Sequence, residues 1–316
     1  MPFAALHSEA EWAAAFGRPS APTVVTIGNF DGVHLGHQRI LGTVCELARQ
    51  ANCKSAVLTF FPHPARVLRP AEAPPLLMTL DQRVAAIEAV GIDAAFVLRF
   101  DLQLAAVSAE DFVRRFLVDM MHARAVLVGG NFRFGHKQAG DVRLLLQLGQ
   151  RWGFDVKTLP PVVKDGIVVS STAIRAALRE GRVEDARNLL GRPYALAGEI
   201  RTGTGQGRKL VVPTLNLVTE QEMLPKNGVY ATEVKLGGKM HRAATNVGMR
   251  PTFDGARVTI ESHLLDFSES LTSGAMEVQF WARLRDEQKF SGPDALRRQV
   301  LKDIDEARRY FAAMPT

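Results

Sequence analysis

Two histidines stand three residues apart in a glycine-rich segment near the start of the chain. Residues 28 to 37 read GNFDGVHLGH, which places the imidazoles at His34 and His37. Glycines allow a close backbone approach to an anion, and the N-terminus of a following helix offers amide groups and a favourable dipole. Two surface histidines in a polar turn are the alternative. We predict that both rings face one phosphate group, which is also bound by Gly28, Asn29, Phe30, Asp31, Gly32 and Gly36.

A run of hydroxyl side chains supplies a second candidate phosphate site. Ser170, Ser171 and Thr172 follow an apolar run and precede a helical stripe, so their hydroxyls and amides are expected at a helix N-terminus. Arg175 adds a positive charge one turn later. Alone, this pattern fits an ordinary helix cap with a solvated arginine equally well. Together with the two histidines it predicts the second wall of a triphosphate site.

An extended segment in the second half carries oxygen ligands at alternate positions. Thr214 and Asn216 project to the same side of an extended chain, where their oxygens can coordinate Mg²⁺ and orient ATP phosphates. The glycine-rich run 203–209 is not a Walker phosphate loop, because it lacks the Gly-Lys pair at the required spacing and Pro213 prevents a following helix. A turn residue and a strand-end asparagine are the alternative.

The elements that must position these residues follow two different patterns. From residue 23 to about residue 181, short β-branched runs alternate with amphipathic helical stretches, which is typical of a parallel sheet covered by helices. Apolar residues at 40, 41, 44, 47 and 48 have helical spacing, and Thr79 with Gln82 forms a capping box. The predicted strands are 24–27, 55–60, 94–98, 125–128, 155–159 and 167–169.

The pattern changes near Gly191, which is expected to end a short helix over 183–190. Gly237-Gly238 is a two-residue hairpin signal between strands, and the tail 293–312 is apolar on one helical face. We therefore expect a small antiparallel β-barrel with a C-terminal helix packed on it. Its predicted strands include 228–236, 239–247, 257–265 and 276–284.

Composition limits the class of protein. The 316 residues are 47% hydrophobic and 23% charged, which is enough for two ordinary domains. The two cysteines, Cys45 and Cys53, lack the spacing of a zinc or redox site. The first residues do not read as an export signal, and no window nears the roughly 18 apolar residues of a membrane span. We predict a soluble, cytoplasmic protein.

The net charge of +6 favours an anionic partner. Basic residues are scattered along the chain, and no aromatic-basic motif typical of RNA recognition is present, so small polyphosphates are the simpler interpretation. A basic nucleic-acid-binding protein remains as an alternative from another class.

The histidine segment resembles the HxGH signature of the nucleotidyltransferase superfamily, and the longer string resembles the bacterial riboflavin kinase/FMN adenylyltransferase family. HxGH alone is shared by many nucleotidyltransferases, whereas the ordered set of segments covers essentially the whole chain and is highly specific. The other segments that resemble this family are TFFPHP (59–64), SAEDFV (108–113), GNFRFG (130–135) with GD (140–141), SSTAIR (170–175), LVVPTLNL (210–217), GVYA (228–231), NVGMRPTF (246–253) and ESHLLDF (261–267).

The resemblance implies a Rossmann-like nucleotidyltransferase domain over residues 1–186 and a riboflavin kinase barrel over residues 187–316. The expected reactions are phosphorylation of riboflavin to FMN by ATP with Mg²⁺, then transfer of an adenylyl group from ATP to FMN with release of pyrophosphate. Adenylyl transfer needs no general base, because a phosphate monoester has a second pKa of about 6 and is largely ionised at neutral pH. His34, His37 and Arg175 are expected to stabilise charge on the phosphates.

The kinase reaction does require a base, since the primary hydroxyl of riboflavin must lose its proton. The resemblance assigns this role to Glu261, a carboxylate in a mostly apolar strand, for which a buried ion pair is the alternative. For Phe132 and Phe134, packing in the core is an equally good explanation. For His63, a rigid turn between two prolines is the alternative. The resemblance further implies flavin contacts at His63, Asn131, Phe132, Phe134 and Arg250, although Asn131 stands where the family often carries aspartate.

Two departures from the family pattern concern the kinase half. Val211 and Val212 precede Pro213 where a glycine is usual, and residues 271–274 read LTSG where a Leu-Tyr-Gly step is expected. A β-branched residue where backbone normally approaches phosphate can weaken nucleotide binding. The nearest alternative is therefore an FMN adenylyltransferase whose barrel binds flavin without catalysis. The sequence leaves the oligomeric state open.

Overall fold

The computed structural model describes residues 3–17, 21–201, 212–252, 255–267 and 271–314, and the side chains of residues 250–257 fall outside this description. Contacts between Cα atoms divide the chain into two compact units, Met1–Ser170 and Ser171–Thr316. The predicted boundary after residue 186 lies 16 residues later than this division, so it assigns residues 171–186 to the first domain. Each unit has an apolar core of its own.

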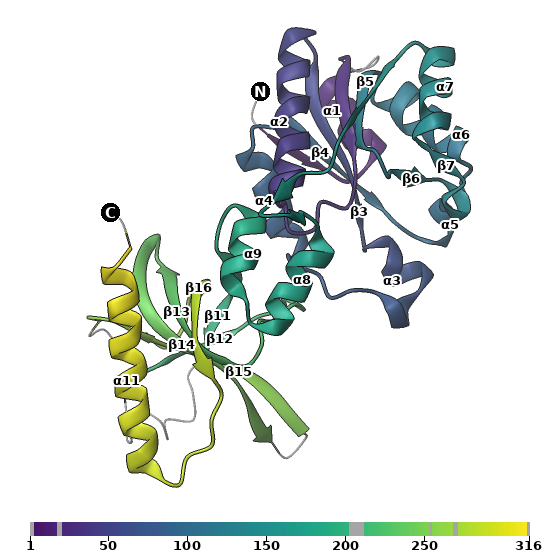
Figure 1. Ribbon diagram of the computed structural model, residues 1–316. Helices are drawn as coiled ribbons and strands as arrows, with labels where there is room; N and C mark the ends of the chain where they lie inside the picture. Colours follow the sequence, from purple (N-terminus) through teal and green to yellow (C-terminus); the bar gives the residue numbers. More distant parts are fainter. Residues whose placement is uncertain (1–2, 18–20, 202–211, 253–254, 268–270, 315–316) are drawn as a thin grey trace. The chain divides into compact units, whose positions relative to one another are not determined.

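A six-stranded sheet forms the centre of the first unit (Figure 1). Its strands are β1 (Ala4–Leu6), β2 (Thr23–Ile27), β3 (Lys54–Phe61), β4 (Ala94–Arg99), β5 (Ala123–Gly129) and β8 (Asp155–Leu159). They pair in parallel in the order β1-β4-β3-β2-β5-β8. The chain winds outward from β2 through β3 and β4, then reverses and continues through β5 and β8. Ligands of such sheets bind outside the carboxyl ends of the strands at this reversal.

Helices cover both faces of this sheet, and all five residues of β2 are buried as a result. Val25 and Ile27 join one apolar cluster, whereas Val24 joins a second cluster with Leu41 and Val44 of α2 (Leu35–Gln50), as the helical spacing predicts. The other described helices are α1 (Glu9–Phe16), α3 (Pro64–Leu68), α4 (Leu80–Ala89), α5 (Leu102–Ala105), α6 (Ala109–Phe112) and α7 (Val142–Trp152), the π-helix η2 (Val113–Met120) and the 3₁₀ turns η1 (Pro70–Glu72) and η3 (His136–Gln138). The predicted capping box of α4 is present at Thr79 and Gln82.

Two parts of the first unit differ from the sequence-based prediction. The edge strand β1 is too short for alternation to reveal it. Residues 167–168 form β10, which pairs antiparallel with β9 (Val163–Lys164) in a separate hairpin and not within the main sheet. Asp165 and Gly166 between them have positive φ angles of 50° and 77°, the geometry of a two-residue hairpin turn. The pair Asp165-Gly166 is a hairpin signal that the sequence analysis did not use. A second small hairpin joins β6 (Arg133–Phe134) to β7 (Gly140–Asp141).

The second unit begins with α8 (Ser171–Glu180) and α9 (Val183–Leu190), after which six antiparallel strands close into a barrel. The hairpin glycines Gly237 and Gly238 have φ angles of 52° and 83°, which is why glycine is favoured at both positions. The predicted fold class, a Rossmann-like domain followed by a small antiparallel barrel, is confirmed. In barrel order the strands are β11 (Tyr194–Arg201), β12 (Leu215–Val218), β15 (Gly255–Leu264), β14 (Lys239–Thr252), β13 (Gly228–Leu236) and β16 (Ala275–Asp286).

Helix α11 (Pro293–Ala312) packs on the outside of the barrel, and its bounds match the predicted ones (Figure 1). Its buried face, which includes Ala307 and Phe311, contacts a cluster that contains Ala231 and Ala244 on the strands. Small side chains on both sides let the helix lie close to the sheet. None of the described helices combines the length and the apolar character needed to cross a membrane.

Candidate active sites

The two histidines of the glycine-rich segment lie against each other at the start of α2. His34 is the N-cap residue, and its Nδ1 accepts a hydrogen bond from the backbone amide of His37 at 3.3 Å. The two rings are stacked, with their centroids 3.7 Å apart and an angle of 15° between their planes. The structure therefore brings both imidazoles together at a helix N-terminus, where the dipole favours an anion.

His37 has an unusual electrostatic environment. Its Nδ1 is buried and has no hydrogen-bond partner among the described residues, and the ring of Phe30 lies 5.0 Å away. Burial, helped by the neighbouring charge of His34, lowers the pKa of His37 well below its ordinary value. The ring is therefore neutral at pH 7 in the free site.

The glycines of this segment make room for the stacked rings and for neighbouring backbone. Gly32 has a φ of 89°, and the next residue, Val33, also lies in the left-handed region at 39°, which is costly for a β-branched side chain. A Cβ atom at Gly36 would lie 3.1 Å from the His34 ring and 3.8 Å from the carbonyl oxygen of Val169. The chain just before Ser170 thus passes beside the histidine segment.

Asp31 and Phe30 face inward and shape the turn from behind. Both carboxylate oxygens of Asp31, which is 3% exposed, accept from the amide of Leu77, at 2.9 and 3.2 Å, and one also accepts from Met78 at 3.3 Å. Phe30 is buried in the second apolar cluster of the sheet. Asp31 therefore fixes residues 77–78 against the turn, and its role in phosphate binding remains a prediction.

Arg83 is a residue of this site that the sequence analysis missed. It is buried, and its guanidinium donates to the carbonyl oxygens of Asn29 at 2.7 Å and Phe60 at 3.1 Å. Burial lowers the pKa of Arg83, while the charge of Asp31 acts in the opposite direction. Arg83 joins the carboxyl ends of β2 and β3. The available signal was its position one turn before the buried Ile87 on the same face of α4.

An aromatic pocket of about 650 Å³ opens at the reversal point of the sheet. Asn131, Phe132 and Phe134 of the loop after β5 line it together with Gly28 and Asn29 of the loop after β2. The rings of Phe132 and Phe134 are stacked with centroids 5.3 Å apart, and Phe134 also belongs to the core. The lining further includes Phe60, Pro64, Phe100, Leu104, Phe112 and His136.

His63 lies beside this pocket as the N-cap residue of α3. Its Nδ1 accepts from the amide of Ala65 at 3.1 Å, and its Nε2 lies 3.1 Å from the side-chain amide nitrogen of Asn29. The structure therefore supports a helix-capping role for His63 and connects it to the histidine segment through Asn29.

The second predicted phosphate site lies at the start of α8, which begins at Ser171. Thr172 is exposed, whereas Arg175 is buried and only 6% exposed. An arginine this deep is not the solvated side chain of the alternative interpretation. Ser171, Thr172 and Arg175 belong to the second unit, and their approach to the histidines across one triphosphate remains a prediction.

On the barrel, β12 and β15 place two predicted kinase residues side by side. Asn216 is directly opposite Glu261 in the antiparallel register, so both side chains point to the same face, about 5 Å apart at Cβ. Both are half-buried, while their strand neighbours Leu217 and Ile260 are buried inside the barrel. Thr214, just before β12, is exposed. The side chain of Arg250 lies outside the described residues.

Comparisons with known proteins follow the same division of the chain. A model of the FAD synthetase family matches residues 18–173, and a model of the riboflavin kinase family matches residues 190–311. The bifunctional riboflavin kinase/FMN adenylyltransferase of Escherichia coli K12 is 36% identical over 93% of this chain and 94% of its own length. The chain belongs to the bifunctional riboflavin kinase/FMN adenylyltransferase family.

Other relatives extend this result. The bifunctional riboflavin kinase/FMN adenylyltransferase of Pseudomonas fluorescens is 38% identical over 92% of this chain and 93% of its own length. A crystal structure described as a macrolide-efflux protein from Streptococcus pneumoniae has a TM-score of 0.86 at 28% identity, and the match covers 98% of this chain and 99% of that one. The family predicted from the sequence is confirmed, and with it a kinase half and an adenylyltransferase half.

One of the two departures from the family pattern lies just before β12, which carries Asn216. Val211 is outside the described residues, whereas Val212 is half-buried and packs against the apolar cluster under α11. The hydrophobic side chain at 212 therefore has a packing role. The carbonyl oxygen of Pro213 accepts from Nδ1 of His263 at 2.9 Å, which ties the start of β12 to β15.

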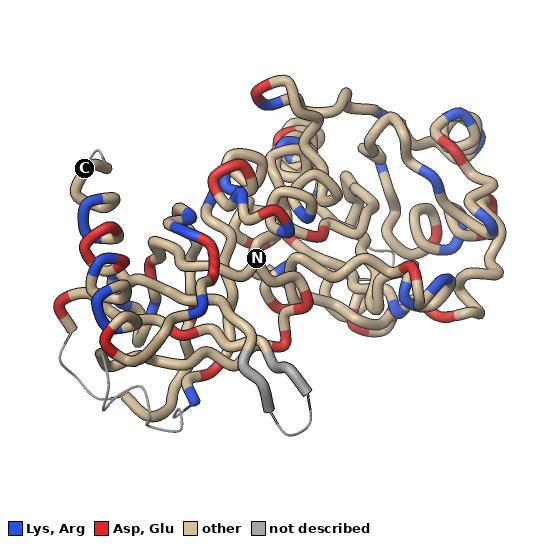
Figure 2. Tube along the Cα trace, turned by 60° about the horizontal axis from the view of Figure 1, so that its bottom comes forward, with Lys and Arg blue, Asp and Glu red and all other residues tan. Residues whose placement is uncertain are grey.

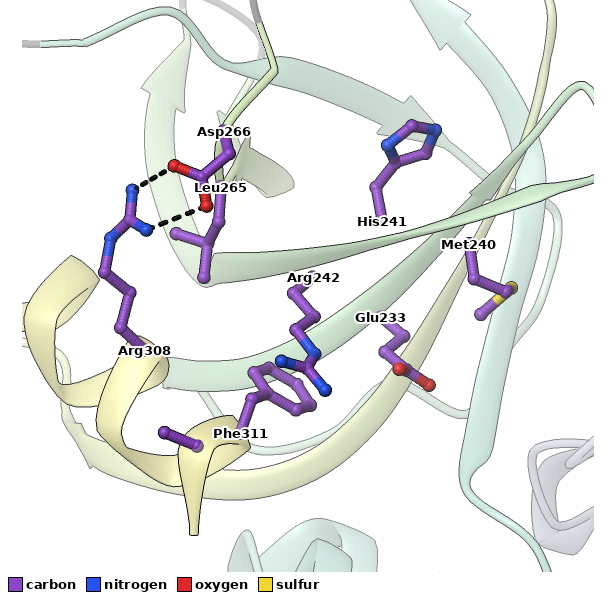
Figure 3. A pocket seen from close by; sticks show the side chains of 9 residues that line it. Glu233, Met240, His241, Arg242, Leu265, Asp266, Arg308 and Phe311 are labelled. Atoms are coloured by element: carbon purple, nitrogen blue, oxygen red, sulfur yellow. Dashed lines mark hydrogen bonds and ion pairs between the residues drawn. The ribbon is translucent and has the colours of Figure 1, made fainter. Parts of the chain in front are cut away.

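A separate pocket of about 500 Å³ lies on the barrel beside the last turns of α11 (Figure 3). Arg308 donates two hydrogen bonds of 2.8 Å to Asp266 on one side, which lowers the pKa of that carboxyl, and the guanidinium of Arg242 lies 5.3 Å from the centre of the Phe311 ring. Among the predicted kinase residues whose side chains are described, none lines this pocket.

Basic and acidic residues lie among one another along the described parts of the chain (Figure 2). Figure 2 shows basic and acidic positions interleaved along α11 and along the described parts of both units. Nucleic-acid sites usually gather lysine and arginine on one face.

Proposed function

We propose that this chain carries out two ATP-dependent reactions, the phosphorylation of riboflavin to FMN on the barrel and the adenylylation of FMN to FAD in the first unit. The observation that supports this most strongly is that one chain matches both family models in succession, the FAD synthetase model over residues 18–173 and the riboflavin kinase model over residues 190–311.

For adenylyl transfer, the phosphate of FMN is the nucleophile and attacks the α-phosphorus of ATP, and pyrophosphate leaves. His34 and His37 bind the phosphates at the N-terminus of α2, and Arg175 with the hydroxyls of residues 170–172 supplies further phosphate contacts. The stacking of the two rings at a helix N-terminus supports this role, because the dipole and amides there favour an anion. These groups act by stabilising charge and need no proton acceptor.

We assign the isoalloxazine ring of FMN to the aromatic pocket. A volume of about 650 Å³ with a mostly apolar lining suits a three-ring aromatic system. Phe132 offers an aromatic face, and Asn131 offers an amide to the polar edge of the ring or to the ribityl chain. Asn29 connects this pocket to the phosphate-binding turn.

For the kinase, Glu261 accepts the proton of the riboflavin primary hydroxyl as its oxygen attacks the γ-phosphorus of ATP, and ADP leaves. The hydroxyl of Thr214 and the amide oxygen of Asn216 are the hard oxygen ligands that Mg²⁺ prefers, and no described residue engages either side chain. Bound there, the metal would neutralise charge on the phosphates.

The proposed partners are small molecules, namely ATP, riboflavin, FMN and a divalent metal, and we expect no nucleic acid. Two free cysteines are consistent with a reducing cytoplasm.

The test is an assay of the purified protein with riboflavin, ATP and Mg²⁺, followed by chromatography of the flavins. Both FMN and FAD should form. Asn216→Ala should abolish FMN formation and leave FAD formation from supplied FMN intact, and His37→Ala should have the reverse effect. FAD from supplied FMN without FMN from riboflavin would instead favour the adenylyltransferase with a non-catalytic barrel.

A mobility-shift experiment at low salt tests the nucleic-acid alternative. Low salt is chosen because a basic protein binds nucleic acid most strongly there. We expect no shift of an RNA or DNA probe at micromolar protein.

A further inference from the structure

A third polar residue continues the row of Asn216 and Glu261 around the outside of the barrel. Strand β15 lies between β12 and β14. Its Glu261 is directly opposite Asn216 on β12 and directly opposite Asn246 on β14. Side chains opposite each other on neighbouring strands project to one face. Asn246 is half-buried, whereas Thr245 and Val247 on either side are buried inside the barrel. The row therefore faces outward as an amide, a carboxylate and an amide.

The side-chain amide of Asn246 is available to a ligand. It has no hydrogen-bond partner among the described residues, although it lies beside the carboxylate that is proposed to act as the base. A half-buried amide in a folded protein normally finds a protein partner or water.

A second carboxylate, that of Glu287, lies near this amide. Glu287, just after β16, accepts from the amide of Met249 at 3.3 Å through Oε1 and from the side chain of Asn227 at 3.0 Å through Oε2. A Cβ atom at Gly248 would lie 2.6 Å from Oε1 of Glu287 and 3.0 Å from Nδ2 of Asn246. The absent side chain of Gly248 thus leaves the space in which this carboxylate sits.

The Asn246 amide nitrogen and the Glu287 carboxylate both border the space beside Gly248. A carboxylate only accepts hydrogen bonds, so it favours the nitrogen of a nearby amide over its oxygen. The amide oxygen can then accept a hydrogen bond from a hydroxyl group. Next to Glu261, the hydroxyl-rich ribityl chain of riboflavin supplies such groups.

We propose that Asn246 binds a ribityl hydroxyl of riboflavin next to the one that loses its proton to Glu261, and that Gly248 and Glu287 position its amide. This inference rests on the proposed kinase function. It adds Asn246 to that site as a substrate-positioning residue, and Glu287, just after β16, as the residue that orients its amide.

The first test measures both activities of the full chain for Asn246→Ala, Asn246→Asp and the matched control Lys239→Ala, an exposed residue on the same strand. For Asn246→Ala we expect kcat/KM for riboflavin to fall roughly tenfold, mainly through KM, because one hydrogen bond is lost. For Asn246→Asp we expect the acidic limb of the kinase pH profile to move to higher pH, because a second carboxylate beside Glu261 favours its protonated form. FAD formation from FMN should be unchanged throughout.

The second test is a mutant cycle on Gly248→Ala and Glu287→Ala. The added methyl group should displace the Glu287 carboxylate and reduce kinase activity, whereas the same change should have little further effect in Glu287→Ala, where the space is free. If the thermal transition shows that Asn246→Ala has lost the barrel fold, Asn246→Ser replaces it in the first test.

Each outcome decides between the claims. A wild-type protein that makes no FMN overturns the proposed function and the inference together. A wild type that makes FMN, with kinase KM and pH profile unmoved in folded Asn246 variants, overturns the inference alone. Independent, additive effects of the Gly248 and Glu287 changes overturn the positioning role.

Discussion

The His37 side chain is placed for an anion, yet it carries no charge of its own in the free site. Its ring stacks on His34, and its buried Nδ1 has no partner among the described residues. Burial lowers its pKa, so the folded protein resists protonating it. A neutral imidazole can still donate one hydrogen bond to phosphate, and a bound polyphosphate reverses the effect of burial by favouring the charged ring.

This pKa shift makes the free energy of unfolding depend on pH. The unfolded chain takes up a proton below about pH 6.5, whereas the folded site does so only at much lower pH, so stability is present above this value and falls as pH decreases below it. His37→Gln removes this contribution. Urea unfolding at about pH 7.5 and about pH 5.5 should show a smaller loss of stability on acidification for the variant. Equal losses in the two proteins would contradict the assignment.

Arg83 presents a different case, because its role is to hold backbone. Replacing it with methionine leaves the carbonyl oxygens of Asn29 and Phe60 without a donor, which should cost about 2–3 kcal/mol of unfolding free energy. FAD formation should fall with the displacement of Asn29. The control is Arg39→Met, an exposed arginine on α2, for which we expect a change within about 0.5 kcal/mol. Denaturant titration followed by the chromatographic assay measures both effects.

The sequence predicted the histidine pair because its chemistry is local, whereas Arg83, Asn246 and Glu287 act through contacts between distant segments. Residue type and spacing within one segment are visible in a sequence. The proximity of Arg83 to Asn29 depends on how α4 packs against the ends of two strands, and that of Glu287 to Gly248 depends on the closure of the barrel.

At the scale of elements, strong local signals were predicted well and weak ones were missed. Helix α11 has a long apolar stripe that begins at a proline, and the β13–β14 hairpin has two glycines that permit its turn. Strand β1 and the β9–β10 hairpin have two or three residues each, so alternation has nothing to repeat. Pairing in such short elements is decided by the rest of the fold.

The packing of α11 gives a prediction at this scale. Ala307 is fully buried in a cluster with alanines of the barrel strands, so Ala307→Leu should overpack the interface and cost about 1–3 kcal/mol. FMN formation should be lost at a lower temperature, and FAD formation from FMN should be retained. Leu301→Ala, at a position that is 46% exposed on the same helix, is the control and should have little effect. An unchanged thermal transition of the barrel in Ala307→Leu would show that the helix adapts freely.

At the scale of the whole molecule, two cores imply two stabilities. Phe280 is fully buried in the barrel and packs edge-on against Tyr230, so Phe280→Ala should destabilise the second unit by about 3–5 kcal/mol. Calorimetry should show one transition lowered and the other unmoved, and FAD formation should survive heating that abolishes FMN formation. A single transition that shifts as a whole would mean that the two units unfold together.

The stacked histidines also have a thermodynamic consequence for substrate binding. A ring that is neutral when free and charged against a polyphosphate takes up a proton from the solvent as the nucleotide binds. The heat of ATP binding measured by calorimetry should then vary with the ionisation enthalpy of the buffer. In this way the burial of one imidazole nitrogen would couple proton uptake to nucleotide binding.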